Sequence, residues 1–233
     1  MTRFLRFLAS FLLLPLAWGL CRAFADSFAL APDAGASVFT PRGLALTLGM
    51  LAFLVLWVVA PAPVRTYVLG HELTHALWGL LFGARVSRLK VGSTGGSVSL
   101  SKSNVWITLA PYFFPFYTMI VVLAALATRF FVTPLPCPPA WAFAVGFTWC
   151  FHCCFTVRSL GQRQPDVQEY GRVFSWTVIF ICNVVGVLLW IGCATEIPLS
   201  VLAHQAAFRV GRAYLATGGF VLESVRSLPF LQR

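Results

Sequence analysis

The chain alternates between long apolar runs and short breaks that are polar or contain proline. A helix that crosses a bilayer needs about 20 mostly apolar residues, with a range of about 17–25. Prolines such as Pro61 and Pro134 mark breaks between runs of this length. The pattern predicts an all-α polytopic membrane protein with about six transmembrane helices: Phe4–Leu20, Gly43–Val59, Val64–Phe82, Trp106–Phe131, Trp141–Val157 and Gly171–Cys193.

The composition of the 233 residues supports this prediction. Hydrophobic residues make up 59% and charged residues 10%, whereas soluble proteins contain about 45–50% and about 25%. So few charges could not cover the surface of a soluble globule, and a disordered chain would be less apolar. The formal net charge is +10, but the basic residues are scattered between the apolar runs. We therefore expect the lipid bilayer as a partner and no nucleic acid.

The first apolar run has two possible interpretations. Arg3 and Arg6 followed by an apolar run and then by Ala23-Phe24-Ala25 fit a signal peptide with a small-residue cleavage site. The apolar run is long for the hydrophobic region of a signal peptide. A retained membrane span is therefore the favoured interpretation.

Residues 84–104 follow a different pattern, with the sequence ARVSRLKVGSTGGSVSLSKSN. Apolar and polar residues alternate on both sides of a Ser-Thr-Gly-Gly turn, which predicts a β-hairpin. The hairpin could be a solvated edge, or it could lie against or dip into the helical bundle. Non-helical backbone at membrane depth is stable only when it is buried in protein or lines a wet cavity.

The last part of the chain is predicted to be a basic amphipathic helix on the membrane surface. Arg209 and Arg212 alternate with apolar residues at helical spacing. We expect two parts of the chain, a polytopic membrane metallopeptidase-like domain at 1–195 and an amphipathic tail at 196–233. The apolar positions of the tail are Ala203, Ala206, Ala207, Val210 and Tyr214.

The strongest chemical signal is His71-Glu72-Leu73-Thr74-His75 in the third apolar run. Two histidines four residues apart on a helix are offset by only about 40°, so both imidazoles can reach one metal ion. Glu72 lies beside His71, where its carboxylate can act on a water bound to that ion. This is the H-E-x-x-H pattern of zinc hydrolases.

The apolar surroundings of Glu72 strengthen this signal. A charged residue near the middle of a bilayer costs at least about 2.5–3.5 kcal/mol. The chain has seven acidic residues, and Glu72 is the one that lies well inside an apolar run. A polar network that merely joins helices is the alternative, but a zinc site explains all three residues together.

The third metal ligand is open to two main interpretations. Catalytic zinc is usually held by three protein ligands and a water, and the candidates are Asp166, His152, Glu169 and His204. His152 lies about 16 Å along the fifth run, level with His75 on a parallel helix. Asp166 begins the sixth run from the opposite side and reaches zinc only if the chain around 161–168 dips inward. Whichever is not the ligand could orient one.

The His71–His75 motif on an apolar helix, the glycine-rich turn Gly92–Gly96 and the later Pro165-Asp166 pair resemble the site-two-protease-like intramembrane zinc metallopeptidases. The resemblance covers roughly residues 64–190. It implies that Asp166 is the third ligand and that the hairpin presents a substrate strand by edge pairing. The chain departs from the family pattern, because the flanking Asn and second Pro are missing and no Gly follows Asp166.

The sequence thus predicts an intramembrane zinc metalloprotease with Zn²⁺ as cofactor. Glu72 would act as general base toward a zinc-activated water that attacks peptide bonds of membrane-associated proteins or peptides. The main alternative is a non-catalytic zinc-binding membrane scaffold or regulator, which would lack an open coordination position reached by water. A small transporter is a third hypothesis, disfavoured because a single run carries buried charge.

Overall fold

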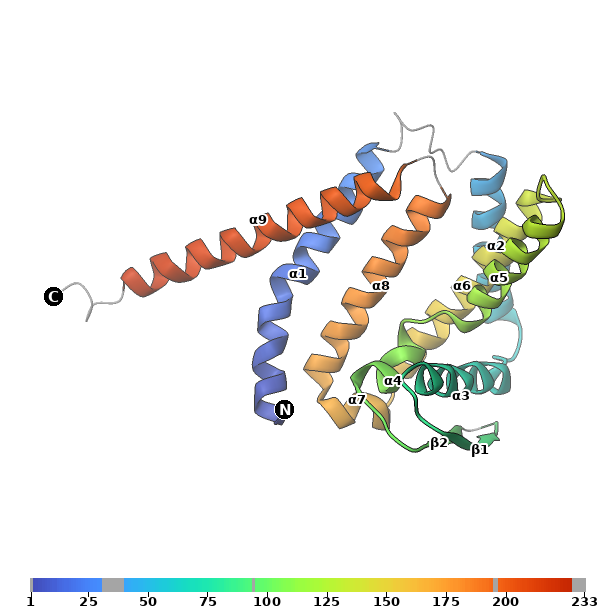
Figure 1. Cartoon of the computed structure of the whole chain (residues 1–233), viewed down its shortest axis with the longest axis horizontal. Helices are drawn as coiled ribbons and strands as arrows, with labels where there is room; N and C mark the ends of the chain where they lie inside the picture. The colour runs from blue at the N-terminus through green and yellow to red at the C-terminus, as the bar shows by residue number, and fades with distance from the viewer. Residues whose placement is uncertain (1, 31–39, 94, 195–196, 228–233) are drawn as a thin grey trace. The chain divides into compact units, whose positions relative to one another are not determined.

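The computed structural model describes residues 2–30, 40–93, 95–194 and 197–227. The described part is mostly helical, with one small antiparallel sheet (Figure 1). Its contacts divide the chain into two units. One consists of residues 38–170, and the other combines residues 1–37 with residues 171–233.

Four helices of the described residues are long and apolar enough to cross a membrane. They are α1 (Arg3–Leu30), α2 (Pro41–Val59), α6 (Pro138–Leu160) and α8 (Arg172–Ala194). Each contains most of a segment that the hydrophobic pattern predicts as a span. The membrane character expected from the sequence is therefore supported, but six spans are not confirmed.

The other two predicted spans differ from simple apolar helices. The third is the helix α3 (Val64–Leu81), whose Arg65, His71, Glu72 and His75 lower its hydropathy, so it is not among the four. The fourth is broken into α4 (Val105–Leu109) with the 3₁₀ turn η1 (Ala110–Tyr112), and α5 (Phe116–Phe131). These two parts are bent by 83° and count as a fifth span only if taken together.

Helices α2 and α6 pack closely, and two glycines permit the approach. An added Cβ on Gly49 would meet the carbonyl oxygen of Phe143, and one on Gly146 would meet the carbonyl oxygen of Leu46. Small residues allow helix backbones to approach in this way in membranes. The core beside this contact contains Phe53, Cys150, Phe151 and Phe155.

The predicted hairpin is confirmed as β1 (Val86–Val91) paired antiparallel with β2 (Gly96–Leu100). The register shifts between Ser87 and Lys90, where Arg88 has a φ of 48°. The hairpin packs against α3: an added Cβ on Gly79 would meet Leu100, and one on Gly96 would meet Glu72. The hairpin thus lies against α3, while most residues of its two strands are exposed.

A short helix, α7 (Pro165–Tyr170), follows α6 in the sequence and packs on α4. It begins at a proline, which suits the first helical turn because its missing N–H would have no partner there. The chain after α6 therefore does not enter the next apolar helix directly. Asp166 lies in the first turn of α7.

The unit of α1, α8 and α9 (Leu199–Arg226) is held together by contacts along α1. Arg209 of α9 forms an ion pair with Asp26 of α1, and the Tyr214 hydroxyl donates to the Leu12 carbonyl at 2.8 Å. The predicted helical tail is thus a helix, and it packs on α1 in the structure. Its placement on a membrane surface stays a prediction.

Gly146→Ala should destabilise the α2–α6 pair. The added methyl group would meet the Leu46 carbonyl, which belongs to the backbone and cannot swing aside. Overpacking of this kind costs about 1–3 kcal/mol. Thermal unfolding in detergent, followed by circular dichroism, should show a lower Tm.

The matched control is Gly186→Ala on α8, where an added Cβ meets no atom of the described residues within 4 Å. Alanine has the higher helix propensity, so the Tm of this variant should stay the same or rise slightly. Equal losses in both variants would contradict a specific close contact at Gly146.

Candidate metal centre

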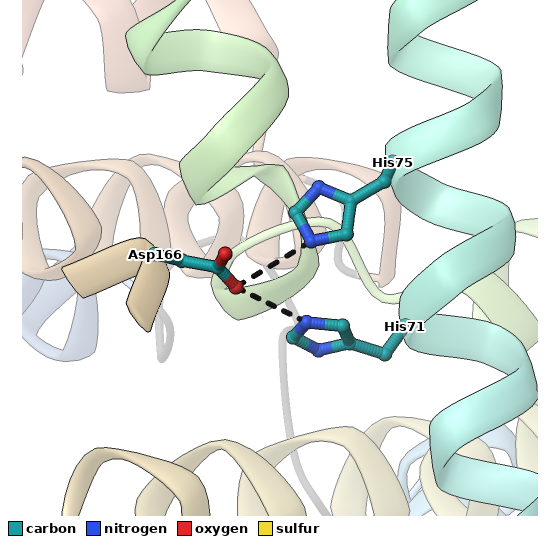
Figure 2. A group of neighbouring side chains, drawn as sticks. All are labelled: His71, His75 and Asp166. Carbon is teal, nitrogen blue, oxygen red and sulfur yellow. Dashed lines mark hydrogen bonds and ion pairs between the residues drawn. The ribbon is translucent and has the colours of Figure 1, made fainter. Parts of the chain in front are cut away.

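Three side chains from two distant parts of the sequence converge on one point (Figure 2). His71 and His75 project from consecutive turns of α3, and their ring centroids are 4.9 Å apart. Asp166 approaches from α7. Its Oδ2 lies 3.3 Å from His71 Nε2 and 3.5 Å from His75 Nε2. The potential ligand atoms all lie within 4.8 Å of one another.

Two of these distances agree with those between ligands of a tetrahedral metal site. Two ligands bound to zinc at about 2.0–2.1 Å and a tetrahedral angle are about 3.3–3.4 Å apart. The two Asp166–histidine distances, 3.3 and 3.5 Å, agree with this separation. Two imidazoles and one carboxylate also form a donor set that suits zinc. The residues present therefore fit a zinc ion.

Hydrogen bonds on the far side of each imidazole orient the rings. His75 Nδ1 lies 2.8 Å from the carbonyl oxygen of Ile107, which can only accept, so the Nδ1 atom carries the proton. In a neutral ring with this tautomer, the Nε2 lone pair would be free to bind a metal ion. Carbonyl partners of this kind fix the tautomer of metal-bound histidines.

His71 is oriented through a short chain of hydroxyl groups. Its Nδ1 lies 3.2 Å from the Tyr67 hydroxyl, which lies 2.7 Å from Ser159 Oγ. If Tyr67 donates to Ser159, its oxygen can accept from His71 Nδ1. The Nε2 lone pair of a neutral His71 would then likewise be free to bind a metal ion.

The Asp166 carboxyl is ionised in this environment. Its burial would raise the pKa, but hydrogen bonds with His71 and His75 outweigh this effect and hold the pKa below its ordinary value. A carboxyl group must be deprotonated to bind a metal. Asp166 therefore meets this requirement throughout the neutral range.

Glu72 is buried, with 7% of its surface exposed, and lies beside the centre without joining the converging ligand atoms. The hairpin covers it, with Gly96 close to its Cγ and the backbone of Val98 at its carboxylate. This arrangement separates Glu72 from the ligands while keeping it in the same cleft. It agrees with the role of a base that is not a ligand.

A cleft of about 780 Å³ opens onto the centre. Its walls come from α3, the hairpin, the end of α6 and α7, all within the unit of residues 38–170. Ligand pockets in proteins commonly enclose about 300–1,000 Å³. Among the residues that line it are His71, Glu72, His75, Gly96, Ser97, Arg158 and Asp166.

The structure brings Asp166 to the two histidines and leaves the other candidates outside the group. His152 is buried in α6 and lines a separate cavity of about 20 Å³ with His71. Its Nε2 has no hydrogen-bond partner among the described residues. Glu169 lines the large cleft, and His204 lies on α9. The depth argument, which placed His152 level with His75 on a parallel helix, favoured His152. That argument treated Asp166 as the start of a span, whereas Asp166 belongs to α7.

Sequence reasoning did not identify two tyrosines that contact the centre. Tyr67 precedes His71 by one helical turn, so its spacing could have placed it on the same face. Tyr112 donates to Asp166 Oδ2 at 3.0 Å from the break in the predicted fourth span. Only the break itself, with its two flanking prolines, pointed toward this position.

Comparison of the chain with protein-family models, with curated proteins and with solved structures found no match.

Asp166→Ala should reduce bound zinc as strongly as His75→Ala, because each variant leaves two of the three converging ligands. His152→Ala should have a milder effect, at most about 10–100-fold in zinc affinity, since His152 only borders His71. Elemental analysis of the purified variants measures the zinc content. Full zinc in Asp166→Ala together with loss in His152→Ala would show that His152 is the ligand.

Proposed function

We propose that this protein is a zinc-dependent membrane peptidase of the site-two-protease-like kind, acting on peptide bonds of membrane-associated proteins. The observation that carries the proposal is the convergence of His71, His75 and Asp166 beside Glu72 in an open cleft. Four chemically suited groups occupy one site, and three of them come from the H-E-x-x-H motif.

His71, His75 and Asp166 would hold the ion. When bound there, zinc would supply a water with a pKa near 7 and a positive charge that polarises a peptide carbonyl. The Glu72 carboxylate would take the proton of the attacking water. Glu72 would then pass that proton to the amide nitrogen as the peptide bond breaks, so that one water is consumed per bond.

The cleft favours an extended substrate. Gly96, Ser97 and Val98 of β2 line it next to Glu72. A helical substrate has its carbonyl groups in hydrogen bonds and must unwind before one can be attacked. Backbone pairing along a strand is a common way to hold a peptide extended. β2 would therefore hold the unwound segment beside the base.

Two measurements on the full chain in detergent test the proposal. Elemental analysis should find about one zinc per chain in the wild type and little in His71→Ala. A pool of synthetic single-span peptides, analysed by mass spectrometry, should be cleaved by the wild type alone. Wild-type protein without a stoichiometric transition metal would exclude the enzyme, whereas zinc without cleavage would favour the scaffold alternative.

Glu72→Gln should abolish cleavage and retain most of the zinc. The amide cannot take a proton from water, but it leaves His71, His75 and Asp166 in place. Zinc content and peptide cleavage are measured on the same preparation, with His71→Ala as the variant that loses both. Zinc loss in Glu72→Gln as large as in His71→Ala would instead make Glu72 a ligand.

A further inference from the structure

The break in the predicted fourth span delivers a tyrosine to the metal centre. α4 ends at Leu109 and continues as the turn η1, and α5 then departs at 83°. Pro111 and Pro115 prevent a continuous helix, because proline lacks the N–H group and clashes with the preceding turn. Tyr112 closes the turn and is completely buried, with 0% of its surface exposed.

Tyr112 contacts two of the three candidate ligand residues. Its hydroxyl donates to Asp166 Oδ2 at 3.0 Å. This is the same oxygen that lies 3.3 and 3.5 Å from the two Nε2 atoms. Its ring meets the His71 ring edge to face, with centroids 5.3 Å apart. The phenol thus touches the centre without belonging to either element that carries the ligands.

The same short segment also contacts the third candidate ligand residue, His75. Ile107 of α4 provides the carbonyl that fixes His75 Nδ1. The residues from α4 to η1 therefore contact His71, His75 and Asp166 through one backbone carbonyl and one tyrosine. In a continuous helix the Ile107 carbonyl would accept from the backbone N–H of residue 111, but Pro111 has none, so this carbonyl can meet His75.

A carboxylate can rotate and can bind a metal through one oxygen or two. A hydrogen bond from Tyr112 to Oδ2 fixes this rotation and leaves the remaining lone pair of that oxygen directed at the two imidazoles. We propose that Tyr112 is a positioning residue of the metal centre, which holds Asp166 as a ligand through Oδ2. The inference rests on the proposed function, because it assumes that the three residues bind a metal.

The test compares Tyr112→Phe with Tyr117→Phe. Each substitution removes one hydroxyl and keeps the ring. The Tyr117 hydroxyl donates instead to the backbone carbonyl of Thr66 at 2.6 Å. The zinc dissociation constant is measured by competition with a chromophoric chelator, using the full chain in detergent. The absorption spectrum of the Co²⁺-loaded protein reports the coordination.

Tyr112→Phe should weaken zinc binding by about 10–100-fold and change the Co²⁺ spectrum, as expected for loss of a partner that orients a ligand. Tyr117→Phe should stay within about twofold of the wild type. In an Asp166→Ala background, Tyr112→Phe should cause no further loss of residual zinc affinity, because the group that it positions is absent.

The outcomes separate this inference from the proposed function. Zinc bound by the wild type and by Tyr112→Phe with equal affinity overturns the role of Tyr112 and leaves the metal centre intact. No zinc in the wild type overturns the metal centre, and this role with it. Thermal melting of the metal-free proteins controls for folding.

Discussion

The meeting of one carboxylate oxygen with two imidazole nitrogens is the constraint on which the rest of this unit depends. Asp166 is separated from His71 by 95 residues, yet its Oδ2 lies 3.3 Å from His71 Nε2. In the metal-binding tautomers, with the ring protons on Nδ1, all three converging atoms would carry free lone pairs. A positive charge between them, either a bound metal ion or the proton of an Nε2–H···Oδ2 hydrogen bond, stabilises such an arrangement. A bound metal ion would supply this charge and would also join α3 to α7.

The polar face of α3 determines what surrounds it. His71, Glu72 and His75 cannot face lipid without a large cost, so other elements must cover them. The hairpin covers Glu72, and the turn at Tyr112 covers His71. Neither cover is a continuous membrane helix. Irregular backbone is stable beside these residues because it is buried in protein or lines the cleft.

The elements with local signals could be predicted from the sequence. The i, i+4 spacing of His71 and His75 places both on one helix face, and the alternation on either side of the glycine-rich turn specifies the hairpin. The course of the chain around Asp166 and the 83° bend before α5 could not be predicted. Proline residues indicate that a helix breaks, but tertiary contacts decide the direction that the chain then takes. Because the course of the chain after α6 could not be predicted, the comparison of depths along parallel helices favoured His152 over Asp166.

The number of protein ligands bears on whether such a site is structural or catalytic. Structural zinc sites are closed by four protein ligands, whereas catalytic sites use three and leave a position for water or substrate. In the part of the chain that the structure describes, three ligand residues converge. They face a cleft of about 780 Å³ that Glu72 also lines. A site built only to hold helices together would gain nothing from this opening, because access for water weakens the electrostatic interactions inside it. The combination of three candidate ligands, a separate carboxylate and an open cleft is therefore the basis for proposing hydrolysis rather than a scaffold.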